Sequence, residues 1–142
     1  MSTAYFEELD LRDELPVPNY YRSRITTARF RRSTNGNRML QVVYALQGVP
    51  AGYDRVAEYF VLEAPSPRGR NMARRRLVEL YRACGLRPQP GEPIDPVDLV
   101  DAEVEVKLEH EQWDGQLRLR VVAHRRLTTT ATNATADDSP PF

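Results

Sequence analysis

The sequence contains very little of what metal sites, most catalytic sites and secreted proteins rely on. Its 142 residues include one cysteine, Cys84, and two histidines, His110 and His124. A single cysteine excludes an internal disulfide framework, and without paired histidines or cysteines no zinc site is expected. Neither a glycine-rich phosphate loop nor a nucleophile elbow occurs. We therefore expect a protein that is not an enzyme and that uses no metal and no cofactor.

Long apolar segments are also missing. No run of about 18 apolar residues is present that would cross a bilayer, and the chain does not start with the charged and then apolar pattern of a signal peptide. These features predict a cytoplasmic protein without membrane contact. The length fits one domain plus a tail, and an apolar content of 41% is enough for one core.

The charges are balanced in number but segregated along the chain. Residues 20–87 carry fourteen basic and four acidic side chains, whereas residues 88–115 carry one basic and nine acidic ones. Nineteen of the twenty cations are arginine, whose guanidinium group binds phosphate in a forked geometry and stacks on bases. A genome rich in G+C would also enrich arginine, but it would not cluster the residues. The basic middle of the chain therefore predicts a polyanionic partner.

The segment from Tyr20 to Leu46 carries the strongest signal, because two strand-like runs flank an Asn35-Gly36 turn. Asn-Gly provides the positive φ angles of a tight hairpin, and the second run alternates Leu40, Val42, Tyr44 and Leu46 against the other face. No acidic residue lies between the arginines of this hairpin, so we expect unpaired guanidinium groups that bind phosphate. These arginines are Arg22, Arg24, Arg29, Arg31, Arg32 and Arg38.

A third strand and a helix are predicted next. Tyr53 to Glu63 alternates as a strand, and a helix starts at an N-cap between Ser66 and Asn71 and ends before Gly85. The helical spacing predicts one buried stripe, formed by Ala73, Leu77, Leu80, Tyr81 and Cys84. The proline-rich residues 86–98 are predicted to form an ordered loop.

A second hairpin is predicted around the Asp114-Gly115 turn. This register places opposite charges on one face and apolar side chains on the other. The expected partners are Glu111 with Arg118, Glu109 with Arg120, Leu108 with Val121, and Val106 with Ala123.

The element order is three strands, one helix and two strands. Five strands with a helix between the third and fourth predict an all-β OB-fold, a five-stranded Greek-key barrel that binds nucleic acid through strands 2 and 3 and the loops after strands 1 and 4. We divide the chain into an acidic N-terminal segment (1–19), this domain (20–127) and a disordered tail (128–142) that has almost nothing to bury.

Aromatic side chains near the arginines are candidates to stack on bases. Tyr44 and Phe60 have the spacing of core residues, whereas the aromatics expected at the binding surface are Phe30, Tyr53, Tyr59 and Trp113. The alternative is a solvated strand face, with the arginines paired to the acidic segment 88–115.

Acidic residues at alternate positions suggest a second alternative, a metal-dependent nuclease. They lie beside Val104, Val106 and Leu108, which is the pattern of an exposed strand face, so we favour a structural role. The residues concerned are Asp101, Glu103, Glu105, Glu109 and Glu111.

The last six residues form a compact motif. Asp137-Asp138-Ser139-Pro140-Pro141-Phe142 combines two acids with an aromatic ring at the end of a polar tail, which suits a basic-rimmed apolar pocket on another protein. This motif resembles the acidic tip of bacterial single-stranded DNA-binding proteins, whose Asp-Asp-x-Pro-Phe ending recruits replication and recombination proteins. Here fewer acids precede the tip, and one proline is extra.

The body of the chain resembles a different family. Residues 15–127, especially the Tyr20–Ile25 run, the Asn35–Asn37 turn and the Ala73–Leu86 helix, are similar to small phage proteins encoded beside recombination genes. Together these features predict a phage-type protein that coats single-stranded DNA and recruits partners through its tip. A recombination mediator or strand-annealing accessory protein, and a module that binds only proteins, remain alternatives, and homo-oligomerisation stays open.

Overall fold

A computed structural model describes residue 4 and residues 16–127, which fold into a mostly β structure with one α-helix. The strands are β1 (Asn19–Arg32), β2 (Arg38–Leu46), β3 (Arg55–Val61), β4 (Glu103–Trp113) and β5 (Gln116–Arg125). The helix α1 (Pro67–Ala83) and the 3₁₀ helix η2 (Pro96–Leu99) lie between β3 and β4 in the chain.

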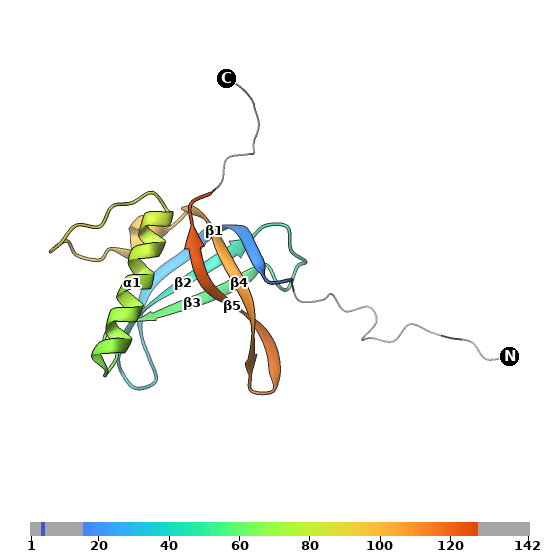
Figure 1. Ribbon diagram of the computed structural model, residues 1–142, viewed down its shortest axis with the longest axis horizontal. Helices are drawn as coiled ribbons and strands as arrows, with labels where there is room; N and C mark the ends of the chain where they lie inside the picture. The colour runs from blue at the N-terminus through green and yellow to red at the C-terminus, as the bar shows by residue number, and fades with distance from the viewer. Residues whose placement is uncertain (1–3, 5–15, 128–142) are drawn as a thin grey trace, which may run out of the picture.

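The five strands form one antiparallel sheet in the order β3-β2-β1-β4-β5 (Figure 1). The central strand β1 pairs with β2 along most of its length but with β4 only from Asn19 to Arg24. The second half of β1 therefore has β2 as its only ladder partner among the described strands. The two edge strands, β3 and β5, lie near one another and both contact α1.

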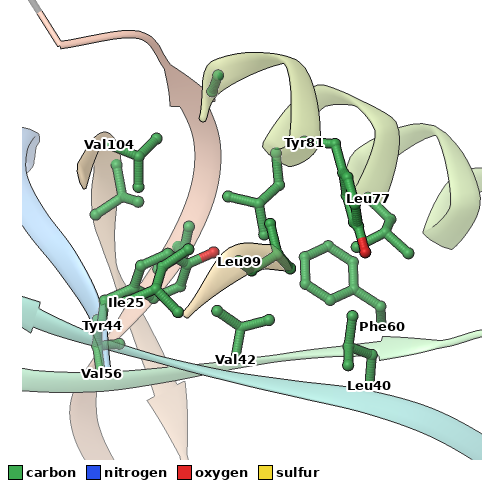
Figure 2. Packing of buried hydrophobic residues seen from close by; sticks show 14 of the residues in the cluster. Ile25, Leu40, Val42, Tyr44, Val56, Phe60, Leu77, Tyr81, Leu99 and Val104 are labelled. Atoms are coloured by element: carbon green, nitrogen blue, oxygen red, sulfur yellow. The ribbon is translucent and has the colours of Figure 1, made fainter. Parts of the chain in front are cut away.

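The core lies between the inner face of the sheet and α1. Figure 2 shows Leu77 and Tyr81 of the helix above Leu40, Val42 and Phe60 of the sheet, and each of these side chains is buried. Leu99 of η2 is fully buried within the same cluster, so the proline-rich loop contributes to the core. Tyr44 and Phe60 are core residues, as predicted.

The helix boundaries follow from local chemistry. Ser66 is the N-cap, its side chain accepts a hydrogen bond from the backbone N–H of Gly69, and Pro67 occupies the first helical turn. Gly85 adopts a φ of 85° after the C-cap, a conformation that costs glycine little. The predicted cap residues are thereby confirmed, and the buried stripe is confirmed except that Cys84 is only partly buried and Ala83 joins it.

The β4–β5 hairpin confirms three of the four predicted pairs and corrects the fourth. Val106 faces His124 rather than Ala123, because an extra residue, Val122, forms a bulge in β5. This bulge turns His124 toward the interior, where its exposed fraction is 6%. Among the described residues no helix is long and apolar enough to cross a membrane.

Candidate nucleic-acid interface

A row of polar side chains crosses the outer face of β1, β2 and β3. The register places Arg29 beside Gln41 and Gln41 beside Tyr59, with Arg31 one position along the same face. The guanidinium groups of Arg29 and Arg31 both donate to Oε1 of Gln41, at 3.1 and 3.3 Å, and Nε2 of Gln41 donates to the Tyr59 hydroxyl at 3.2 Å. We call these four residues the arginine–tyrosine row.

The arginine–tyrosine row holds two cations without neutralising them. Gln41 is 8% exposed and carries no charge, so it orients both guanidinium groups while their positive charge stays available to an anion. Tyr59 is 45% exposed, which leaves part of its ring open to solvent. A surface of this kind can contact a phosphate and a base side by side.

A β-bulge at Thr26 decides which arginines share this face. Strict alternation along β1 would place Arg24 on the face opposite Arg29 and Arg31. The register shift between Ile25 and Thr27 brings all three arginines to the outer face.

Two of the six hairpin arginines are already paired, so the expectation of six unpaired guanidinium groups is wrong. Arg24 donates to Glu103 at 2.7 Å, and Arg22 approaches the same carboxylate at 4.0 Å. These two arginines lie on the half of β1 that pairs with the acidic strand β4, whereas Arg29 and Arg31 lie beyond the end of that ladder.

The remaining hairpin candidates lie apart from the arginine–tyrosine row. Arg32 donates to the carbonyl of Gly36 in the turn, at 2.9 Å. The guanidinium of Arg38 lies 4.1 Å from the centroid of the Phe30 ring, and Phe30 packs against the core from the inner face. Phe30 therefore does not share a surface with Tyr59.

A groove runs beside the arginine–tyrosine row, between β3 and β5. Its volume is about 570 Å³, and Tyr53 and Tyr59 line it together with Leu117. Four more arginines line the groove, and none of them was predicted to bind DNA: Arg55, Arg76, Arg118 and Arg120. Glu111 holds two of them, Arg118 at 2.8 Å and Arg120 at 3.8 Å. The two-residue period of a strand puts Arg55 on the same face as Tyr59, and this pattern was the available signal for this part of the interface.

The turn that joins β4 and β5 carries Trp113. The ladder pairs Trp113 with Gln116, and the turn residues Asp114 and Gly115 adopt φ angles of 52° and 78°. The Trp113 side chain lies outside the described part of the structure, as do residues Asp137 to Phe142 of the tail.

The acidic residues of β4 do not all form the exposed face that was expected. Glu105 is 6% exposed and accepts a hydrogen bond from Nε of Arg125 at 2.6 Å, while Glu103 binds Arg24. Within residue 4 and residues 16–127, no group of three His, Cys, Asp or Glu side chains is arranged to hold a metal ion.

A buried polar network lies under the groove and joins β3, β5 and α1. Oε1 of Glu58 is 2.7 Å from the Tyr44 hydroxyl and 2.7 Å from Nε2 of His124, and Arg76 forms an ion pair with the other oxygen of Glu58. Nδ1 of His124 lies 2.7 Å from Glu79 on α1. Burial, with the adjacent Glu58 carboxylate as a further cause, raises the pKa of Tyr44 well above its ordinary value, so this hydroxyl stays a donor.

Cys84 is unsuited to act as a nucleophile near neutral pH. Burial raises the pKa of its thiol to about 11, so the thiolate is scarce.

No protein-family model matches the chain, and a search of curated proteins finds no significant match. The function is therefore inferred from the surface itself.

Proposed function

We propose that the protein is a non-catalytic single-stranded DNA-binding protein whose strand lies across the arginine–tyrosine row and the neighbouring groove. The observation that carries this proposal is the pair Arg29 and Arg31, which a neutral glutamine orients beside a half-exposed tyrosine. An ion-paired structural arginine would have a carboxylate in the place of Gln41.

The sheet topology supports a more specific fold, the OB-fold. Starting from β3-β2-β1-β4-β5, an approach of β3 to β5 closes a five-stranded Greek-key barrel, and α1 follows β3 in the chain as it does in that fold. In such a barrel the nucleic acid crosses strands 2 and 3, which carry Gln41 and Tyr59 of the arginine–tyrosine row, while Arg29 and Arg31 lie beside them on β1. The β4–β5 turn with Trp113 then forms one end of the binding surface.

Binding on this surface is expected to tolerate any base sequence. Guanidinium groups contact the phosphates, and Tyr53 and Tyr59 offer rings on which any base stacks. The acidic tip from Asp137 to Phe142 supplies a separate function, the recruitment of replication or recombination proteins. With the resemblance to small phage proteins, these features support a role in phage DNA replication or recombination in the host cytoplasm.

A titration of fluorescent poly-dT at several salt concentrations tests the proposal. Four to six phosphate contacts give a slope of log K against log salt of about −3 to −4, at roughly −0.7 per contact on single strands. The double substitution Arg29→Gln/Arg31→Gln should reduce the magnitude of the slope by about 1.4.

One exposed arginine outside the interface provides a matched control. Arg87 lies in the loop after α1, and Arg87→Gln removes the same charge as Arg29→Gln. Arg29→Gln should change the slope by about 0.7 and Arg87→Gln should leave it unchanged. A slope near zero for the unmodified protein, or equal effects of the two single substitutions, would remove the interface from consideration.

A further inference from the structure

The outer side of α1 carries a second group of arginines. The helix contains six arginines and one acidic residue, Glu79. Residues seven apart lie on the same side of a helix, so Arg68, Arg75 and Arg82 form a line along it. We call these three residues the helix stripe.

The helix stripe is exposed and has one acidic neighbour, Glu79, which lies between Arg75 and Arg82 on the same side of the helix. Within the described part of the chain, Arg68, Arg75 and Arg82 have neither an ion pair nor a hydrogen bond from their side chains. The only acid of the helix, Glu79, is occupied on one oxygen by the backbone N–H and the ring Nδ1 of His124.

The arginines of the helix stripe do not stabilise α1 through the helix dipole at its start or through contacts with the rest of the fold. The N-terminal turn of a helix favours acidic side chains, but the first turn of α1 has none and carries Arg68. The nearby Arg70 and Arg76 do have structural roles, since Arg70 donates to the carbonyl of Ala64 and Arg76 pairs with Glu58. Such contacts are missing for the helix stripe.

The basic character continues onto the end of β5. An open depression of about 850 Å³ lies between α1 and β5, and Arg126 lines it beside Arg75 and Arg82. Arg68 and Arg82 are separated by about 21 Å along the axis at 1.5 Å per residue. This length lets three guanidinium groups contact three separate phosphates of one strand.

The helix stripe and the arginine–tyrosine row lie on different sides of the core. Leu77 and Leu80 of α1 belong to the core on the inner face of the sheet, where Figure 2 shows Leu77, so the stripe faces away from the sheet. Arg29 and Tyr59 both register with Gln41 on the outer face of the sheet. A single strand held by the arginine–tyrosine row leaves the stripe free.

We propose that the helix stripe is a second nucleic-acid phosphate site, so that the protein holds two strands at once. This inference rests on the proposed single-strand binding by the sheet. Two strands held by one protein are brought to a high local concentration, which favours their annealing when they are complementary.

A two-strand capture assay tests the inference. Biotinylated dT₃₀ on beads is saturated with protein, unbound protein is washed away, and fluorescent dT₃₀ is added. The two oligonucleotides cannot pair, so captured fluorescence reports a protein bridge. Three phosphate contacts give a slope of about −2, so capture should weaken roughly 20-fold between 50 and 200 mM salt.

Reciprocal variants assign the bridge to the helix. Arg68→Gln/Arg75→Gln/Arg82→Gln should coat the beads as the unmodified protein does, within about twofold, but lose second-strand capture by at least tenfold. The same three positions changed to lysine keep the charge and should retain most of the capture. Arg29→Gln/Arg31→Gln should instead reduce coating of the beads.

The outcomes separate the two proposals. If the unmodified protein coats the beads but captures no second strand, the helix stripe is not a strand site and the single-strand proposal stands. Capture that survives the triple glutamine substitution would mean that copies of the protein bridge the strands through their sheets, which also overturns the inference. Failure to coat the beads removes both proposals.

Discussion

The buried Glu58 carboxylate should be one of the most sensitive positions in the fold. Its side chain is 4% exposed and meets three donors, the Tyr44 hydroxyl, the His124 ring and the Arg76 guanidinium. Glu58→Gln keeps the shape but supplies only one acceptor oxygen. The amide NH₂ must then face one of the three donors.

The cost of Glu58→Gln follows from which donor loses its acceptor. Arg76 is 36% exposed at its side chain and can turn toward water, whereas His124 is 1% exposed and cannot. The amide oxygen should therefore stay with Tyr44 and His124. The loss is then one charge-assisted bond, about 1.5–3 kcal/mol, plus the weakening of the two that remain. We expect about 2–4 kcal/mol, or roughly 8–16 °C in Tm at about 4 °C per kcal/mol.

Thermal and urea unfolding measured by circular dichroism test this expectation. Glu109→Gln is the matched control, because Glu109 is exposed on β4 and should change stability by less than about 0.5 kcal/mol. A double-mutant cycle with His124→Asn should show coupling of about 0.5–3 kcal/mol. If Glu58→Gln and Glu109→Gln lower Tm equally, the network does not stabilise the junction of β3, β5 and α1.

Three further predictions concern the hairpin turn, the tail and alkaline pH. Trp113 fluorescence should fall on addition of single-stranded DNA, and Trp113→Ala should weaken binding by about 1–3 kcal/mol; unchanged fluorescence with a much lower Tm would place the ring in the core instead. Phe142→Ala should abolish capture of replication proteins while poly-dT affinity stays the same, and capture that persists would make the resemblance of the tip accidental. Urea stability should hold up to pH 9 and fall between pH 9 and 12, because burial raises the pKa of Cys84 to about 11 and that of Tyr81 to about 12, so the unfolded chain loses these protons first. Cys84→Ala should move the onset of this loss to about pH 10, the ordinary pKa of tyrosine, and an unchanged onset would contradict the assignment.

Local signals in the sequence were sufficient for the five strands, for α1 and for its caps. They did not predict the 3₁₀ helix Pro96–Leu99, and β3 spans Arg55–Val61 rather than the predicted Tyr53–Glu63. The Asn35-Gly36 and Asp114-Gly115 turns, the alternation of β2 and β3, and the Ser66 cap each depend on residues a few positions apart. The chemistry of these signals is complete within each segment, so no tertiary information was needed. The first turn differs from the prediction in one respect: the β1–β2 ladder ends at Arg32 and Arg38, so the loop is longer than a two-residue turn, and of Asn35 and Gly36 only Gly36 has a positive φ.

The two bulges could not be predicted in the same way. Thr26 and Val122 are good strand residues with nothing to mark them as extra, yet each reverses the faces of the residues that follow. The first bulge places Arg24 with Arg29 and Arg31, and the second turns His124 inward. Both effects appear only when the partner strands fix the register.

Charge pairing between distant segments was predicted only as an alternative, in which the arginines pair with the acidic segment 88–115, and the structure shows it for Arg22 and Arg24. The sequence showed that Arg22 to Arg38 has no acidic neighbour, but Glu103 reaches Arg22 and Arg24 from β4, about 80 residues later. Where the β1–β4 ladder ends at Arg24, this compensation ends too. The length of the β1–β4 ladder therefore decides which arginines of β1 lie beside acidic residues of β4 and which can bind an external anion.

Strand β3 combines stability and binding in neighbouring residues. It is an edge of the sheet, and among the described residues no backbone ladder joins it to β5. Glu58 points inward and ties this edge to His124 and α1, while the next residue, Tyr59, points outward into the arginine–tyrosine row. An edge strand held by one ladder alone could shift and carry Tyr59 out of line with Gln41. The buried network therefore fixes the position of the ring that the proposed function needs, and it does so with polar contacts whose geometry specifies one register.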